Sequence, residues 1–412
     1  MKRMASLKMI PAMLLVLFSG AASASGFQLM EQNASGIGNA YAGSAAVAEN
    51  ASTVYFNPAG MTQLQGREVS LGVSAVKPSF KFNDKGSNVG SLGTSGEGGD
   101  AGGWSVLPNG YASWALTKDV YAGIGISSPF GLKTEYDDYW VGAAQARSFE
   151  IKTVNINPSL AWRVNDKWSL GAGLNWQRLE ATYKRLASTG AGAASVKMTL
   201  DDDTWGWNVG ALYTVSSSTK LGFSYRSAIK HETEGQTDSN GVKANNTKAT
   251  LKLPDTAIIS VAQQLSDRWQ MLGDLSWTGW SSIPRVNIIN ADTGAVSQVL
   301  ETDFRNTWRI ALGANYKYND AWKFKYGIAY DQTPVKRAEN RLVSLPDNDR
   351  VWFSFGAQWT PNKASRVDLG VSYIHVRDSK IDNDQTSNTR GRVTGEYSGD
   401  IWVLGAQYSL AF

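Results

Sequence analysis

The sequence has no cysteine among its 412 residues and only two histidines, His231 and His375, which lie far apart. The lack of cysteine excludes disulfides, thiolate metal sites, iron–sulfur clusters and cysteine nucleophiles. Two isolated histidines give little basis for a histidine-rich metal site. The sequence also has no hydrolase, zinc-protease or nucleotide-binding motif. We therefore predict no catalytic residue, no metal site and no cofactor.

Charge and long apolar runs are also scarce. Charged residues make up 18% of the chain, and the net charge is +4, to which Lys2, Arg3 and Lys8 contribute three units. The remaining charge is too small to indicate nucleic-acid binding. No stretch beyond the N-terminus approaches the ~18 apolar residues of a membrane-spanning helix. The aromatic content of 11% is too high for a disordered chain, so the sequence is that of a large folded protein.

The N-terminus has the three parts of a secretory signal peptide. Residues 1–8 are basic, residues 9–18 form a short apolar stretch, and Ala22, Ser23 and Ala24 form a cleavage motif. The apolar stretch is too short to span a membrane, and a buried N-terminal helix is the alternative interpretation. We predict that residues 1–24 are a signal peptide and that the mature protein leaves the cytoplasm.

Two regions of different composition follow. Residues 25–66 are rich in Gly, Ala, Ser and Asn and show no strand-like alternation. From residue 67 onward apolar residues alternate with polar or small ones, as where Trp308, Ile310 and Leu312 share one face of a strand. We predict a compact N-terminal hatch domain over 25–66 and a β-domain over 67–412.

The connections between the predicted strands alternate between short and long. Alternation alone also fits a soluble β-sandwich, but tight turns at one end and long loops at the other are typical of outer-membrane barrels. Tight turns are predicted at 117–119, 165–167, 216–218, 266–267, 319–321 and 361–363, and long loops at 81–108, 129–147, 186–202, 234–246, 284–301, 333–349 and 379–391. The pattern predicts an all-β transmembrane fold, a 14-stranded antiparallel outer-membrane β-barrel plugged by the N-terminal hatch segment.

Aromatic residues flank the predicted turns. Amphipathic rings at strand ends suit the headgroup girdle of a membrane barrel, and core aromatics at sheet corners are the alternative. The lumen of a fourteen-stranded barrel is too wide for wall side chains to fill, so residues 25–66 are the candidate plug. The chain ends on Phe412 in an alternating strand, which matches the C-terminal signal of bacterial outer-membrane barrels. The proposed girdle contains Tyr121, Trp162, Trp168, Trp269, Tyr318, Trp322 and Trp359.

Four motifs in the same order resemble the long-chain fatty acid transporters of the Gram-negative outer membrane. They are residues 26–29 (GFQL), the hatch motif Asn57, Pro58 and Ala59, residues 303–313 (DFRNTWRIALG) and residues 344–352 (SLPDNDRVW). The similarity runs through the whole mature chain. The family includes branches that admit monoaromatic hydrocarbons, so the resemblance fixes the expected fold more firmly than the expected substrate.

The resemblance implies a 14-stranded barrel with an N-terminal hatch, and a kink in the third strand through which ligand leaves sideways into the bilayer. Ser128, Pro129, Phe130 and Gly131 end the third predicted strand, and Pro and Gly do not continue a regular ladder. We predict the wall kink at these four residues. An ordinary strand end before a loop is the alternative.

A fatty acid needs an apolar cavity for its tail and a cation for its carboxylate. By resemblance, Arg185 and Arg305 match the basic positions of the family's ligand pocket, and Phe27 adds an apolar contact. Solvated barrel charges and a frayed N-terminus are the alternatives for these residues. Arg178, Lys184 and Arg309 are competitors for the role of the two arginines.

We therefore expect an outer-membrane channel for passive uptake of hydrophobic ligands through binding sites, with long-chain fatty acids as the first expectation and monoaromatic hydrocarbons as the alternative. An outer-membrane lipid-active enzyme and a structural or adhesive barrel are further alternatives. The expected partners are the hydrophobic small molecule, outer-membrane lipid and lipopolysaccharide. Nucleic acid is not an expected partner, and we expect a monomer.

Overall fold

A computed structural model describes residues 26–189 and 192–412 of the chain. The predicted signal peptide, residues 1–24, lies outside the described residues. None of the helices in the described ranges has the length and apolar character needed to cross a membrane. The helices are short: η1 (Ile37–Asn39), α2 (Thr53–Phe56), η2 (Pro58–Gln63), η3 (Gly90–Leu92), η4 (Trp280–Ser282), η5 (Ala338–Asn340) and η6 (Thr386–Asn388).

The described residues form one sheet of 19 strand segments. The first ten are β1 (Arg67–Asp84), β2 (Ser105–Ala115), β3 (Val120–Ser127), β4 (Gly131–Glu135), β5 (Ser148–Arg163), β6 (Trp168–Thr189), β7 (Gly192–Thr214), β8 (Thr219–Arg226), β9 (Ile229–Ser239) and β10 (Val242–Leu253). The other nine are β11 (Thr256–Gln264), β12 (Trp269–Thr278), β13 (Arg285–Asn290), β14 (Val296–Glu301), β15 (Thr307–Lys317), β16 (Trp322–Asp331), β17 (Arg350–Asn362), β18 (Ser365–Asp384) and β19 (Arg392–Ala411).

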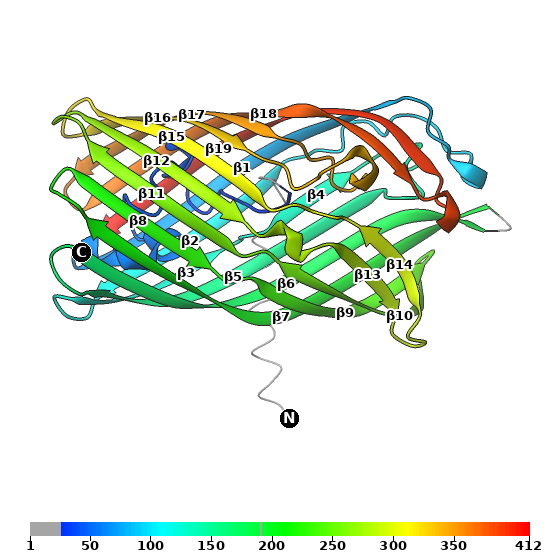
Figure 1. Cartoon of the computed structure of the whole chain (residues 1–412), viewed down its shortest axis with the longest axis horizontal. Coiled ribbons are helices and arrows are strands. Elements are labelled where there is room, and N and C mark those ends of the chain that lie inside the picture. Colours follow the sequence, from blue (N-terminus) through cyan, green and yellow to red (C-terminus); the bar gives the residue numbers. More distant parts are fainter. Residues whose placement is uncertain (1–25, 190–191) are drawn as a thin grey trace.

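The sheet closes on itself as a 14-stranded antiparallel barrel, which confirms the predicted barrel. The first and last strands pair from Glu68 with Ala411 to Asp84 with Gly395. Five wall strands consist of two segments each: β3 and β4, β8 and β9, β10 and β11, β12 and β13, and β14 and β15. Figure 1 shows the tilted strands around the lumen, with short turns at one end and long hairpins at the other. We call these two ends the turn half and the hairpin half.

The outer face of the barrel is apolar where the strands cross the membrane. In β15, Trp308, Ile310 and Leu312 face outward with about half of each side chain exposed, whereas Arg309 and Ala311 face the lumen and are buried. Six of the seven proposed girdle aromatics are exposed at the turn half. The seventh assignment is wrong, because Tyr121 points inward and packs with Val54 and Met61 of the hatch segment.

The long loops predicted at 186–202, 234–246 and 284–301 are wrong, because each of these segments is largely β-hairpin. β6 and β7 pair up to Thr189 with Gly192, and β9 and β10 pair up to Ser239 with Val242. β13 and β14 form the third hairpin. These extensions lie beyond the apolar belt, so polar residues occupy both faces and the alternation that marks a membrane strand is missing. The six predicted tight turns all connect paired neighbouring strands.

The hatch segment, which we define as residues 26–66, lies inside the turn half of the barrel, where Figure 1 draws it in blue. Almost all of its residues from 26 to 62 are buried or half-buried. Wall glycines allow the two backbones to approach. A Cβ atom at Gly222 would overlap the Ala45 carbonyl, and one at Gly210 would overlap the side-chain oxygen of Asn57. The small residues on both sides are therefore required by the contact.

An arginine on the lipid face tests the membrane orientation of the barrel. Leu312 lies in the middle of β15, and Leu265 lies in the tight turn after β11. We expect Leu312→Arg to lower the free energy of unfolding by about 2–4 kcal/mol and Leu265→Arg by about 0–1 kcal/mol, because the cost falls toward the interface. Guanidinium unfolding from lipid vesicles measures both values. Equal costs at the two sites would contradict this orientation.

Candidate functional site

An apolar pocket lies in the lumen, mainly between the hairpin half and the tip of the hatch segment. About 770 Å³ of space lies between the atoms that line it, and part of this space is open to solvent. None of the described residues that line it is charged. The lining residues are Phe27, Leu132, Phe149, Ile151, Leu179, Ala181, Met198, Leu200, Thr233, Ala249, Leu251, Ile283, Val286, Ile288, Leu300, Thr302, Phe304, Leu342, Ser344 and Leu345.

Phe27 closes this apolar pocket on the hatch side. Its ring lies 4.8 Å from the ring of Trp280 and 6.1 Å from that of Phe130, measured between centroids. Phe304 extends the cluster, with its ring 5.9 Å from Trp280. The preceding residue, Gly26, donates its backbone N–H to Asp347 Oδ2 at 3.0 Å. We call Phe27, Phe130, Trp280 and Phe304 the aromatic cluster; it includes Phe27, one of the three predicted ligand residues.

Sequence reasoning missed Trp280. The tight turn predicted at 266–267 and the long loop predicted at 284–301 imply one regular strand over 268–283, but β12 ends at Thr278 and the one-turn helix η4 follows. This turn places the Trp280 indole in the lumen with no measurable exposure. Gly26 adopts a positive φ of 64°, and any side chain there would come within 2.7 Å of the Trp280 ring. Gly279 and Pro284, which flank the turn, were the sequence signal that the strand would not continue.

The wall is interrupted at the predicted kink residues. β3 ends at Ser127 and β4 begins at Gly131, while β5 pairs with both segments. The segment between them is therefore a break within one wall strand. β2 pairs with β3, and in the described chain no ladder joins β2 to β4.

The hatch segment completes the hydrogen bonding at this break. Gln28 forms an antiparallel bridge with Phe130. The Leu29 N–H donates to the Pro129 carbonyl at 2.8 Å, and the Gly131 N–H donates to the Phe27 carbonyl at 2.9 Å. The hatch segment thus stands where a neighbouring barrel strand would otherwise pair.

A second cavity lies between the hatch segment and the wall. About 850 Å³ of space lies between its lining atoms, part of it open to solvent, and the lining combines apolar residues with two arginines and one aspartate. We call it the mixed cavity. It is lined by Gln28, Leu29, Met30, Gln32, Tyr55, Phe56, Phe130, Gln177, Ser224, Arg226, Ser227, Ile229, Pro254, Thr256, Ile258, Ser276, Thr278, Thr307, Arg309 and Asp331.

The other two predicted ligand residues do not line either cavity. Arg185 is in β6, and its Nη1 donates to the Leu186 carbonyl at 3.2 Å. Arg305 directly follows Phe304, but its Nε donates to the Thr333 carbonyl at 3.0 Å. Its Nη2 lies 3.8 Å from a carboxylate oxygen of Asp349. The ligand role of Arg185 and Arg305 therefore stays a prediction, and their competitor Arg309 is the one that lines a cavity.

The motif Asn57, Pro58 and Ala59 fixes the hatch segment to the wall. The Asn57 side-chain amide donates to the Ala45 carbonyl at 2.7 Å and to the Ala211 carbonyl of β7 at 2.9 Å. Its side-chain oxygen accepts a hydrogen bond from the Ala59 N–H at 3.1 Å. Pro58 begins η2, where its fixed φ is compatible with the first turn.

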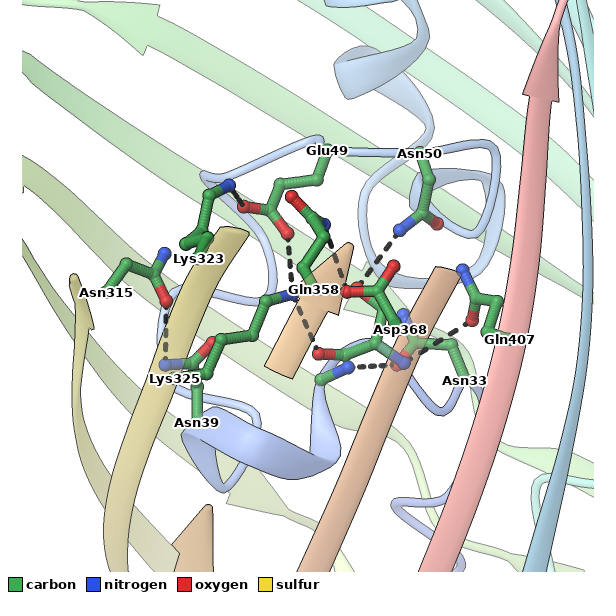
Figure 2. Close-up of polar contacts among 12 residues, drawn as sticks. Asn33, Asn39, Glu49, Asn50, Asn315, Lys323, Lys325, Gln358, Asp368 and Gln407 are labelled. Carbon is green, nitrogen blue, oxygen red and sulfur yellow. Dashed lines mark hydrogen bonds and ion pairs between the residues drawn. The ribbon is translucent and has the colours of Figure 1, made fainter. Parts of the chain in front are cut away.

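A buried ionic network holds the opposite side of the hatch segment. Lys325 of β16 lies 2.9 Å from both Asp368 and Glu49, and it donates to the Ser35 carbonyl at 3.1 Å. Figure 2 shows these side chains converging below the Glu49 loop. Burial raises the pKa of the Glu49 carboxyl, but Lys323 and Lys325 outweigh burial and hold that pKa well below its usual range.

Glu31 shows the opposite behaviour. Burial raises its pKa to about 7, although its own backbone amide and the charges of Arg350 and Arg309 favour the ionised form. The two acidic residues of the hatch segment thus differ because only Glu49 has ammonium groups in direct contact.

His231 is the one histidine that faces the lumen. Its Nδ1 lies 3.0 Å from Asp202 Oδ2, and its Nε2 lies 3.1 Å from the side-chain amide nitrogen of Gln177. A hydrolytic base would need its second nitrogen to face a hydroxyl or a water. This arrangement gives no support to the lipid-active enzyme that the sequence left as an alternative.

The closed barrel and its apolar outer belt define a membrane-spanning barrel of the outer membrane. The chain belongs to the outer membrane protein transport protein family (OMPP1/FadL/TodX), whose family model matches residues 15–412.

Individual relatives agree with this assignment. The chain is 29% identical over 447 residues to the long-chain fatty acid transport protein of Escherichia coli K12, and 97% of each chain is covered. The crystal structure of a Pseudomonas aeruginosa FadL homologue matches with a TM-score of 0.86 at 25% identity, over 94% of this chain and 99% of that one. The Pseudomonas putida toluene transporter TodX shares the fold, with a TM-score of 0.69 at 18% identity. The match covers 92% of this chain and 98% of that one.

Removing the Lys325 ammonium tests the ionic network. We expect Lys325→Gln to lower the free energy of hatch opening by about 3–5 kcal/mol, because the buried Asp368 loses the ammonium that pairs with it and Glu49 keeps only Lys323. Lys323→Gln is the matched control, since Lys323 binds the same Glu49 but is 29% exposed, and we expect it to cost about 0–1 kcal/mol. Native-state hydrogen exchange of the amides of residues 33–50 measures both. If the two variants lowered the free energy of hatch opening by similar amounts, the burial of Lys325 would not explain its contribution to that free energy.

Proposed function

We propose that the protein is an outer-membrane channel that takes up long-chain fatty acids by passive diffusion and releases them sideways through the break between β3 and β4. The observation that carries this proposal is the apolar pocket, which Phe27 of the hatch segment closes directly beside the break. The match to a long-chain fatty acid transport protein over nearly the whole chain supports the same substrate class.

The apolar pocket suits an alkyl chain. Each methylene group transferred from water contributes about 0.8 kcal/mol, and the lining offers this burial without a charged side chain. Uptake down a concentration gradient needs no energy source when the ligand binds in steps and leaves into lipid. The hatch segment would act as the plug that keeps water and solutes from passing in the resting state.

The hydrogen bonding at the break supports lateral release. The edge of β4 that faces β2 is occupied by the Phe27 carbonyl and, further along, by Ala101, whose carbonyl accepts from the Glu135 N–H at 3.0 Å. Withdrawal of the hatch tip exposes this edge at the place where β2 and β4 do not pair. An unpaired edge is costly in lipid, so the opening is transient and closes again with the hatch.

The neutral lining of the apolar pocket favours one second candidate, a channel for neutral aromatic hydrocarbons. Equilibrium binding of oleate and of toluene to the purified mature protein in detergent separates the two. We expect saturable binding of oleate that weakens when its carboxylate is esterified, because the ester cannot pair with a cation. Binding of toluene without oleate would replace the fatty acid by a hydrocarbon, and binding of neither would favour the structural or adhesive barrel.

A disulfide across the break tests lateral release. Gln28 and Phe130 face each other in the bridge, where the Cβ atoms of an antiparallel pair are about 5 Å apart and within reach of a disulfide after a small adjustment. The natural chain has no cysteine, so Gln28→Cys with Phe130→Cys gives one defined bond.

We expect oleate uptake by cells to be lost in the oxidised double variant and restored by a reductant, because the hatch tip can then no longer leave the break. The reduced double variant and the two single variants are the controls. Uptake that is unaffected by oxidation, with the disulfide verified by mass spectrometry, would contradict release through this break.

A further inference from the structure

We infer that the mixed cavity is a second ligand subsite, in which Arg309 and Arg226 bind the carboxylate of an amphiphile whose tail has been accepted by the apolar pocket. This inference rests on the proposed function and deepens it, since the apolar pocket offers no cation for a charged headgroup. It assigns the headgroup to the wall of β8 and β15 and not to the predicted positions Arg185 and Arg305.

Arg309 carries the argument. Its side chain is 5% exposed and lines the mixed cavity. Its Nη2 donates to the Ala40 carbonyl at 2.7 Å, and its guanidinium lies 5.0 Å from the centre of the Trp352 ring. Within the described part of the chain, Nε and Nη1 have no hydrogen-bond partner. Buried charged donors without partners are costly, so these two nitrogens mark a place where an acceptor is missing.

Arg226 supplies a second, fixed cation on the same cavity wall. Its guanidinium stacks over the Tyr55 ring at 4.1 Å, and its Nη2 donates to the Tyr55 carbonyl at 3.0 Å. Its Nη1 also bonds to the side-chain oxygen of Asn175. These contacts hold the guanidinium in one orientation, which lowers the entropy cost of binding an anion.

The charges of the lining residues differ from those around them, because Glu31 and Asp274 also act on Arg309 from outside the lining. Asp331 lines the cavity together with the two arginines, so the lining has a formal excess of one positive charge. Asp274, on β12, is bound by the hatch through the N–H of Gly43 at 2.9 Å and the hydroxyl of Ser44 at 2.6 Å. The Ser276 hydroxyl, which also lines the cavity, lacks a partner in the described chain and is a further donor for a carboxylate.

The rest of the lining fits the first methylenes of an alkyl chain. Leu29, Met30, Ile229 and Ile258 present apolar surface beside the arginines. Phe130 belongs both to this lining and to the aromatic cluster that closes the apolar pocket. The two cavities are therefore neighbours across the aromatic cluster. A fatty acid that passes the cluster head first meets two guanidinium groups next to the wall break.

Photo-crosslinking on the wild-type protein tests this assignment without any variant. One C16 fatty acid carries a diazirine next to the carboxylate, and a second carries it near the methyl end. We expect the head-labelled probe to modify residues of the mixed cavity, such as Leu29, Met30, Ile229 or Ile258, with protection by excess oleate. Adducts of the head-labelled probe only in the apolar pocket, or around Arg185 and Arg305, would overturn the subsite while leaving the proposed function in place. No saturable adduct with either probe would overturn both.

Variants give an independent measurement. We expect Arg309→Gln to weaken oleate binding roughly tenfold, as for the loss of a charge-assisted hydrogen bond, and to leave the binding of neutral methyl oleate unchanged. Arg309→Lys should retain most of the oleate affinity. Because Arg309 also bonds to the hatch at Ala40, equal weakening of both ligands would mean a loosened hatch and would overturn the subsite. Selective loss of oleate in Arg185→Ala with Arg305→Ala, but not in Arg309→Gln, would also overturn it.

Discussion

The structure depends on one constraint, which is that no backbone N–H or C=O group can be left unpaired in lipid. The chain satisfies it by pairing its first strand with its last, so that the sheet has no edge. Fourteen strands then enclose a lumen that wall side chains cannot fill. The hatch segment, the cavities and the wall break are all consequences of how that lumen is occupied.

Buried hydrogen bonds and ion pairs in the lumen hold the hatch segment against the wall. On one side, Asn57 bonds to the backbone of β7, and glycines in the wall leave room for the hatch backbone. On the other side, Lys325 joins Glu49 of the hatch to Asp368 of the wall. Buried ions need partners, so these contacts fix the hatch in one register. Its tip is held at the wall break, by Asp347, and by the Gln28 side chain, which bonds to Thr256 and Thr278.

The two cavities differ in the chemistry of their lining. The apolar pocket takes hydrocarbon and offers no charge, while the mixed cavity combines apolar surface with the guanidinium groups of Arg226 and Arg309. The aromatic cluster separates them and includes Phe27 of the hatch and Phe130 of the break. Movement of one short segment would therefore connect the two cavities and open the wall at the same time.

The sequence by itself determined the barrel and its strand number, because side-chain alternation and turn chemistry are local properties. Ser128, Pro129 and Phe130, which do not continue a ladder, lie between β3 and β4, and their role as a wall kink stays a prediction. The sequence did not place Tyr121 inside, turn Trp280 into the lumen, or bring Arg309 rather than Arg185 and Arg305 to a cavity. Alternation tells which face of a strand a residue is on, but only closure of the barrel around the hatch decides which residues meet across the lumen.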